Sequence, residues 1–284
     1  MSRALVVLDP GPLTTVQDLG RRGWAHLGVP RSGVLDAPAA RYANRLVGNP
    51  DDAAVLETTL GGVDLEVTAA MSLAVTGAHA VVCVDGRERA FGEPVTVRAG
   101  QRVVVGPARS GLRSYVAVAG GVDVPAVLGS RSTDTLSGLG PRPLAAGSRL
   151  PVGPRPGEPQ GVDVPAVRRH DPAVLLRLTA GPRHDWYTDD ALATLGGAAY
   201  TVSADSNRIG LRLHGARLAR RSGDELPSEG IVLGAVQVPA SGEPLVFLND
   251  HPTTGGYPVV GVVAPEDLPL CAQLRPGDEV RFRV

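Results

Sequence analysis

The sequence contains no lysine: all 28 of its basic residues are arginines, and with 29 acidic residues they give a formal net charge of -1. Without lysine, the chain can carry neither biotin nor a Schiff base on that side chain. It also lacks the Gly-x-x-x-x-Gly-Lys phosphate loop, so arginines, backbone N–H groups or a second chain would have to hold any nucleotide. The balanced charge offers no broad positive surface for nucleic acids or anionic membranes, and we expect neither as a partner.

Long hydrophobic runs are also absent, since none approaches the ~20 residues that span a membrane. The apolar run at residues 4–8 stops at Asp9-Pro10 and is too short for the core of a signal peptide, so we expect a cytoplasmic protein. Cys83 and Cys271 stand far apart among apolar neighbours, which favours buried thiols over a disulfide framework. No clustered His/Cys set predicts a metal site, and no Gly-x-Ser-x-Gly elbow predicts a serine nucleophile.

Glycine and proline are abundant, with 36 and 25 residues, and 43% of the chain is hydrophobic. This composition is typical of globular proteins built from short strands and turns. Residues 63–67 and 71–75 alternate like half-buried strands. Helix signals are few, at residues 37–47 with Asp36 as the cap and at residues 189–195. The sequence therefore predicts a mainly β protein with few short helices.

Two similar halves divide the chain. In each, an apolar strand leads into Gly-Pro, at residues 11–12 and 181–182, and a glycine turn leads into an alternating strand, at residues 98–105 and 275–282. This recurrence is typical of short-strand barrels. Glycine and proline are dense at residues 138–165, which indicates a linker or a long irregular connection. The predicted domains are an N-terminal β-barrel domain ending in this connection, residues 1–165, and a C-terminal β-barrel domain, residues 166–284.

Residues 249–258, Asn-Asp-His-Pro-Thr-Thr-Gly-Gly-Tyr-Pro, place several reactive groups between two apolar runs. Polar groups on a loop held by buried strands are typical of binding and catalytic sites. Asp250 or His251 could act as a general base, and Tyr257 or Thr254 could donate to a developing oxyanion. The alternative is a polar hairpin with a solvated tip.

Three further clusters offer polar side chains on glycine-rich loops. They lie at residues 14–21 with 28–36, at residues 205–210, and at residues 228–230 with 234–239. The first could orient an anionic or amide-bearing ligand; alternatively, Asp36 caps a helix and Asp18 with Arg21 forms a surface turn pair. In the second, Arg208 could grip a carboxylate or phosphate, or the segment is an ordinary turn. In the third, a buried Gln237 would need partners from a ligand or a second strand. The candidate ligand-binding residues are Thr14, Thr15, Gln17, Arg21, Ser32, Asp36, Asn207, Arg208, Gln237, Thr253, Thr254, Gly255 and Gly256, and the candidate catalytic residues are Asp18, Glu229, Asp250 and Tyr257.

Taken in order, these motifs resemble the family of the C subunit of bacterial 5-oxoprolinase. That family is also called allophanate hydrolase subunit 2 and is similar to half of the carboxyltransferase domain of urea carboxylase. The motifs that carry the resemblance extend over nearly the whole chain: residues 14–21, 32–36, 43–49, 56–59, 206–210, 228–230, 237–239, 253–258 and 273–277.

The resemblance implies two cyclophilin-like β-barrel domains and a stable heterodimer with a B-subunit homologue, with the catalytic site near or across that pairing. It leaves open whether two heterodimers associate. With an A-subunit homologue as a third, transient partner, the family converts 5-oxoproline, ATP and water into L-glutamate, ADP and phosphate. ATP with Mg²⁺ is therefore expected at the level of the complex. Phosphorylation of the lactam oxygen, a step for the B and C subunits, would prepare a resistant amide for hydrolysis by the A subunit.

On the matched motifs, Arg208 or Arg21 would suit the substrate carboxylate or phosphates, while Asp250, Glu229 and Asp18 could bind a metal or orient water. Two alternative functions stay open. One is a carboxyltransferase that accepts CO2 from a biotin on another chain, and the other is a regulatory protein that binds a partner resembling a kinase inhibitor.

Overall fold

A computed structural model describes residues 3–154, 171–221, 224 and 226–284. The chain divides into two compact units. The predicted domain boundary at residue 165 lies outside the described residues. Two short segments of the first half, residues 22–31 and 135–137, belong to the second unit, which no feature of composition had indicated. Unit 1 comprises Met1–Arg21, Ser32–Asp134 and Gly138–His170, and unit 2 comprises Arg22–Arg31, Thr135–Ser137 and Asp171–Val284.

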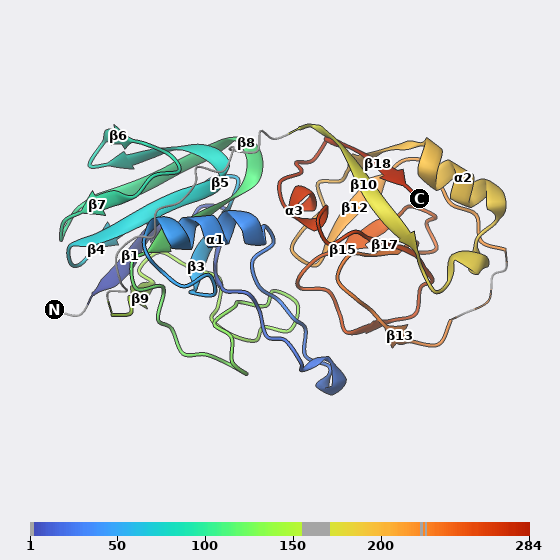
Figure 1. The fold of residues 1–284 in the computed structure, drawn as a ribbon, viewed down its shortest axis with the longest axis horizontal. Helices are drawn as coiled ribbons and strands as arrows, with labels where there is room; N and C mark the ends of the chain where they lie inside the picture. Colours follow the sequence, from blue (N-terminus) through green and yellow to red (C-terminus); the bar gives the residue numbers. More distant parts are fainter. Residues whose placement is uncertain (1–2, 155–170, 222–223, 225) are drawn as a thin grey trace. The chain divides into compact units, whose positions relative to one another are not determined.

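The predicted mainly β architecture is confirmed, because strands build both units and the described residues form three short α-helices (Figure 1). The predicted helix at residues 37–47 is α1 (Ala37–Leu46), and the one at residues 189–195 is α2 (Asp189–Gly197), which runs two residues further. In the described part of the chain, no helix has the length and hydropathy needed to span a bilayer. The remaining helices are α3 (Leu268–Cys271) and the 3-10 turns η1 (Ala25–Leu27) and η2 (His184–Trp186).

Unit 1 contains a nine-stranded sheet organised around two long strands, β5 and β8, which pair antiparallel along most of their length (Figure 1). On its other edge, β8 pairs with β3 near one end and with β4 near the other, so the short turn between β3 and β4 marks a corner of the sheet. The strands are β1 (Ala4–Asp9), β2 (Leu13–Gln17), β3 (Val55–Thr59), β4 (Val63–Val67), β5 (Met71–Val84), β6 (Arg87–Arg89), β7 (Val95–Val97), β8 (Arg102–Val118) and β9 (Arg149–Pro151).

The two faces of this sheet bury different cores. On β8, Val116 and Val118 point into the main apolar cluster, whereas Tyr115 and Ala117 pack in a second cluster with α1. This alternation follows from the two-residue period of a strand. Helix α1 begins as predicted, because Oδ1 of Asp36 accepts a hydrogen bond from the backbone N of residue 39 at 3.1 Å.

The described part of the Gly/Pro-rich connection is packed onto unit 1. Strand β9 pairs with β1, and Leu144 and Leu150 are buried in the main apolar cluster. Residues 138–154 are therefore the irregular connection, the second of the two alternatives, and not a free linker. Residues 155–165 lie outside the described residues.

Unit 2 contains a closed barrel of seven strands in the order β10-β17-β14-β15-β12-β11-β18. The ring closes at β10, whose first five residues pair parallel with β18 and whose last three pair antiparallel with β17. A separate two-stranded ribbon joins β13 to β16. The barrel strands are β10 (Ala173–Ala180), β11 (Ala199–Val202), β12 (Gly210–His214), β14 (Ala235–Gln237), β15 (Leu245–Phe247), β17 (Val259–Val263) and β18 (Glu279–Arg283), and the ribbon strands are β13 (Glu229–Gly230) and β16 (Thr254–Gly255).

The corner between β3 and β4 requires glycine at residue 62. Gly62 has φ +79°, and an added Cβ would lie 1.9 Å from the carbonyl oxygen of Val105 and 2.6 Å from that of Gly106. Gly86, in the turn between β5 and β6, has a similar φ of +75° but meets nothing within 4 Å. Substitution of Gly86 would therefore measure the cost of the left-handed conformation alone, whereas substitution of Gly62 would add the cost of a backbone clash.

Gly62→Ala is expected to lower the free energy of unfolding by at least about 2 kcal/mol, because backbone atoms must move to admit the methyl group. Gly86→Ala should cost only about 1 kcal/mol, which is the effect of φ alone. Urea denaturation of the parent and both variants measures the difference. Equal losses for the two variants would contradict the close approach at the corner.

Candidate functional site

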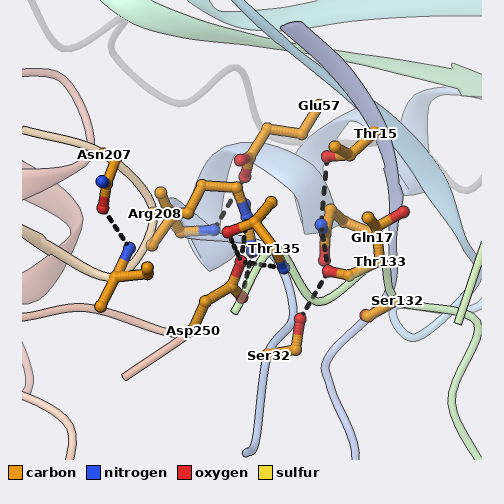
Figure 2. A network of polar contacts seen from close by, with 12 residues as sticks. Thr15, Gln17, Ser32, Glu57, Ser132, Thr133, Thr135, Asn207, Arg208 and Asp250 are labelled. Atoms are coloured by element: carbon orange, nitrogen blue, oxygen red, sulfur yellow. Dashed lines mark hydrogen bonds and ion pairs between the residues drawn. The ribbon is translucent and has the colours of Figure 1, made fainter. Parts of the chain in front are cut away.

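The densest group of predicted residues in unit 1 lies at the end of β2. The side-chain Nε2 of Gln17 donates to Thr15 Oγ1 at 3.0 Å and to the backbone carbonyl of Thr133 at 2.9 Å, and Ser32 Oγ donates to the same carbonyl at 2.7 Å (Figure 2). None of these four side chains is more than 1% exposed. The structure thus gathers three predicted residues around Thr133, which the motifs had not singled out.

Two polar atoms of this cluster, Gln17 Oε1 and Thr133 Oγ1, are shielded from solvent and have no hydrogen-bond partner among the described residues. Leaving such a group unpaired costs about 1–3 kcal/mol. The orientation of the Gln17 amide is fixed, because its Nε2 faces a carbonyl oxygen, which only accepts hydrogen bonds. The cluster therefore keeps one acceptor and one hydroxyl for a ligand or an ordered water.

The carboxylate of Asp18 anchors the irregular segment at residues 130–134. Its Oδ1 accepts from the hydroxyls of Ser130 and Ser132, each at 2.6 Å, and from the backbone N of Gly20 at 2.8 Å. The backbone N of Asp18 donates in turn to Ser132 Oγ at 3.0 Å. A carboxylate that accepts this many hydrogen bonds has little capacity left to bind a metal or orient water.

Arg21 braces the same segment from its carbonyl side. Its Nη2 donates to the backbone carbonyl of Ser132, and its Nε lies 3.4 Å from that of Val127. Both Asp18 and Arg21 are buried. The alternative in which these two residues form a surface turn pair is therefore wrong.

Two other predicted ligand-binding residues support local structure. Thr14 Oγ1 donates to the backbone carbonyl of Pro10 at 2.7 Å. Asp36 is the helix cap, as its alternative interpretation predicted, and its backbone N donates to the Tyr115 hydroxyl at 2.8 Å.

A buried ionisable network lies beside this cap. Glu57 accepts from the backbone N of Leu35 at 2.9 Å, and its Oε1 lies 3.8 Å from Nε of Arg113. Burial, and to a lesser extent the charges of Glu57 and Asp36, raise the pKa of the Tyr115 phenol well above its ordinary value. The hydroxyl therefore keeps its proton. Glu57 lies in the motif at residues 56–59, but no site role was predicted for it because it stands in an otherwise ordinary strand sequence.

In unit 2, a buried ion pair links the segment before β12 to the loop after β15. Arg208 Nε lies 2.9 Å from Asp250 Oδ2 and Nη2 lies 3.1 Å from Oδ1 (Figure 2). The backbone N and the hydroxyl of Thr135 donate to the same Oδ2 at 3.0 and 2.7 Å. Burial alone would raise the pKa of the Asp250 carboxyl, but the charge and hydrogen bonds of Arg208, with those of Thr135, hold it below its ordinary value. Such a carboxylate is a weak base, so this geometry favours an orienting role for Asp250.

The neighbours of this ion pair are held locally. His251, the alternative general base, is buried, and its Nδ1 lies 2.8 Å from the backbone carbonyl of Pro252. Asn207 is exposed, and its Oδ1 accepts from the backbone N of Ile209 at 2.8 Å. The ordinary turn predicted as the alternative for residues 205–207 is thereby confirmed.

The polar motifs at residues 228–230 and 253–258 meet in the ribbon formed by β13 and β16. Gln237, which is 3% exposed, donates from Nε2 to the backbone carbonyl of Tyr257 at 2.8 Å. The chain itself thus supplies a partner for this buried amide. At Gly255, an added Cβ would lie 2.5 Å from Ile231 Cδ1, so the Ile231 side chain would have to shift to admit a larger residue there.

The exposed side of this ribbon carries two further predicted catalytic residues. Arg183 binds both carboxylate oxygens of Glu229, and this hydrogen bonding lowers the pKa of Glu229. The guanidinium of Arg220 lies 5.5 Å from the centre of the Tyr257 ring. Tyr257 is 45% exposed, so it is the predicted catalytic residue that the structure presents most openly to solvent. Thr254 and Gly256 are exposed beside it, and Thr253 is half-buried.

The carboxylates predicted to bind a metal do not gather into a metal site in the part of the chain that the structure describes. Among the residues that the structure describes, no group of three or more His, Cys, Asp or Glu side chains is suited to a metal. Asp18, Glu229 and Asp250 each bind other groups of the protein. Cys271 is buried, as predicted, whereas Cys83 is only partly buried.

Comparison with known proteins places these units in a family. The family model described as the carboxyltransferase domain, subdomain A and B, matches residues 27–284. The C subunit of 5-oxoprolinase from Escherichia coli (strain K12) is 38% identical over 98% of this chain and 90% of its own length. Its namesake from Haemophilus influenzae is 31% identical over 97% of this chain and 89% of its own length. Urea amidolyase from Lachancea kluyveri is 33% identical over 98% of this chain but only 17% of its own length.

Solved structures agree with these matches. TTHA0988 superposes with a TM-score of 0.89 and 40% identity, covering 99% of this chain and 55% of that chain. Urea amidolyase from K. lactis superposes with a TM-score of 0.92 and 32% identity, covering 98% of this chain and 18% of that chain. This chain therefore spans about half the length of TTHA0988 and less than a fifth of the urea amidolyase. The resemblance carried by the sequence motifs is confirmed: the chain belongs to the carboxyltransferase-domain family, subdomain A and B, together with the C subunits of 5-oxoprolinase.

Proposed function

We propose that this chain is the C subunit of an ATP-dependent 5-oxoprolinase, acting in the cytoplasm. With a B-subunit homologue it would activate the lactam of 5-oxoproline, and an A-subunit homologue would complete hydrolysis to L-glutamate, ADP and phosphate. One observation carries the proposal: the two relatives named as the C subunit of 5-oxoprolinase match this chain over 90% and 89% of their own lengths.

The cluster around Gln17 and Thr133 supports an amide as the ligand. Gln17 Oε1 and Thr133 Oγ1 are neutral hydrogen-bonding atoms, which suit the uncharged amide group of a ligand better than an isolated ion. In unit 2, Asp250 neutralises Arg208, so this pair is better suited to hold the loop after β15 than to bind an anionic substrate. Tyr257 remains the candidate donor to a developing oxyanion, since its ring is accessible and Arg220 lies over one face.

ATP and Mg²⁺ would then be bound by the assembled complex. The chain has no lysine, and the carboxylates predicted for a metal bind protein partners instead. Phosphorylation would convert the lactam oxygen into a better leaving group, and this chain would contribute orientation and hydrogen bonds to that step.

Glutamate release by the reconstituted enzyme tests this proposal. The three subunits with 5-oxoproline and ATP should release L-glutamate and ADP, and omission of this chain should abolish the activity. A complex of all three chains that leaves 5-oxoproline intact would contradict the proposed function.

Carboxyl transfer is the second candidate, favoured by the family description and by the superposition on urea amidolyase. Biotin would have to be attached to another chain, because this one has no lysine. Avidin separates the two functions: it should block a biotin-dependent reaction and leave oxoprolinase activity unchanged.

We expect this chain to assemble stably with its B-subunit homologue. Obligate partners commonly bury about 2,000 Å² or more, which holds them together during chromatography. After co-expression, both chains should therefore elute together from a size-exclusion column, and the mass of the peak should show whether two heterodimers pair. Independent elution of two monomers would contradict the assembly.

The Arg208–Asp250 pair should behave as a structural unit. Asp250→Ala is expected to lower the free energy of unfolding by about 3–5 kcal/mol, because it leaves the Arg208 charge buried and uncompensated. The double variant Arg208→Met/Asp250→Leu should lose less than this single variant. Urea denaturation of the parent and both variants tests the order, and a double variant less stable than Asp250→Ala would contradict it.

The stability contributed by Asp250 should also depend on pH in a defined direction. Its folded pKa is lowered, so the contribution is fully present above the unfolded pKa of about 4 and is lost as pH falls through the folded value. The stability gap between the parent and the double variant should therefore shrink below about pH 4. A gap that grows on acidification would show that the carboxylate is not stabilised by folding.

Tyr257→Phe is expected to reduce turnover of the reconstituted enzyme by about 10²–10³-fold if its hydroxyl donates in the transition state. Thermal stability should not change, since the hydroxyl lies on a side chain that is 45% exposed. Tyr42→Phe, on α1, serves as the matched control and should leave turnover unaltered. Equal rates for the parent and Tyr257→Phe would favour the alternative in which residues 249–258 form a polar hairpin with a solvated tip.

A further inference from the structure

We propose that Gln17 and Thr133 bind the N–H and C=O groups of a cis amide, the edge that lactams and urea share. Gln17 Oε1 would accept the ligand N–H, and Thr133 Oγ1 would donate to the ligand carbonyl. The inference deepens the proposed function, on which it rests for the reaction that consumes the amide, by naming the chemical group recognised and the two residues that recognise it.

The acceptor follows from the bonds that Gln17 already makes. Its Nε2 donates to Thr15 Oγ1 at 3.0 Å and to the Thr133 carbonyl at 2.9 Å, so both amide hydrogens are used. The opposite end of the amide, Oε1, is buried without a partner among the described residues. Because an amide oxygen only accepts hydrogen bonds, a ligand at this position must supply a donor. A bare carboxylate or phosphate has none to offer.

The role of the Thr133 hydroxyl as a donor follows from the hydrogen bonds that the rest of the residue makes. Its backbone carbonyl accepts from Gln17 and Ser32, and its backbone N donates to the carbonyl of Val16 at 2.9 Å. Within the described chain, the side-chain Oγ1 is left without a partner, although Thr133 is only 1% exposed. This hydroxyl can donate to a carbonyl of the same ligand whose N–H reaches Gln17.

A cis amide satisfies both atoms at once. In the ring of a lactam, the N–H and C=O point to the same side, whereas in a trans amide they point to opposite sides. Urea offers the same edge without a ring. Asp18 and Arg21 are bound to segment 130–134. The two atoms proposed for recognition, an amide oxygen and a hydroxyl, are neutral, which suits the uncharged amide group of the ligand.

Access requires a local opening, because both atoms are shielded from solvent in the ligand-free chain. Thr133 lies on the irregular stretch between β8 and β9, which forms only isolated bridges among the described residues. Opening this stretch breaks no pairing between the named strands, but it must break hydrogen bonds that Asp18 and Arg21 make to it. Binding should therefore protect backbone amides of residues 130–134 from hydrogen exchange.

The test is direct binding of small amides to the full chain, alone and paired with its B-subunit homologue, by calorimetry or ligand-observed NMR. The probes are 5-oxoproline, 2-pyrrolidinone, urea and N-methyl-2-pyrrolidinone, the last of which lacks the N–H donor. We expect N-methylation to weaken binding by at least about tenfold, the value of one hydrogen bond. Thr133→Val should weaken binding of 2-pyrrolidinone by a similar factor, and Thr133→Ser should restore it.

The matched control is Thr76→Val. Thr76 is also a buried threonine, but its hydroxyl donates to the backbone carbonyl of Ala39 at 2.7 Å. Thr76→Val should lower the melting temperature and leave amide binding unchanged. Thr133→Val should show the opposite pattern, because it removes a hydroxyl that bonds to nothing in the described chain.

Two binding results would overturn the inference: no probe binds the parent chain or its complex, or Thr133→Val binds 2-pyrrolidinone as tightly as the parent. The second would mean that a trapped water satisfies these atoms. Failure of the proposed function gives a different pattern, in which the amides bind in a Thr133-dependent way but no glutamate is released from 5-oxoproline. Conversely, the Thr133→Val enzyme could release glutamate with the parent's KM for 5-oxoproline. That result would support the proposed function and contradict the role of Thr133 in amide binding.

Discussion

A buried carboxylate must have its oxygens hydrogen-bonded, and this constraint organises both candidate regions of the chain. In unit 1, Asp18 accepts from two serine hydroxyls and from backbone N–H groups of the segments it joins. In unit 2, Asp250 accepts from Arg208 and Thr135. In both cases, a charge that looked available for catalysis is used to hold irregular backbone in place. The loops that carry the candidate sites are thus held in place because their acids are already bound.

This bracing decides which atoms are left for a ligand. With Asp18 and Arg21 bound to segment 130–134, the amide of Gln17 is locked against the Thr133 carbonyl. The side chain of Gln17 is therefore already held in one orientation, so a ligand that enters once the segment opens fixes little further side-chain freedom there. Gln17 Oε1 and Thr133 Oγ1, unpaired among the described residues, also carry an energetic penalty that a matching ligand removes.

Regular elements and composition made much of this fold predictable. Strand alternation, the Asp36 cap and the glycine ends of the helices correctly located α1, α2, β4 and the start of β5. The roles of Asp18 and Asp250 were not predictable, since Ser130 and Ser132, which bind Asp18, and Thr135, which binds Asp250, stand more than 100 residues away in sequence. The hydroxyl-rich run Ser-Arg-Ser-Thr-Asp-Thr at residues 130–135 was the available signal. It was overlooked because it borders a Gly/Pro-rich stretch that looks like a connection.

Under the proposed function, the distribution of charge assigns different tasks to this chain and to its partner subunits. Hydrolysis of a lactam coupled to ATP needs cations to stabilise transferring phosphoryl oxygens and carboxylates to hold Mg²⁺. Here the chain has no lysine, Arg208 is neutralised by Asp250, and Glu229 is bound by Arg183. What it has in a fixed and buried form is a neutral amide-recognition edge. If the proposed function holds, this chain would orient the amide, and the partner subunits would supply the charges that activate it.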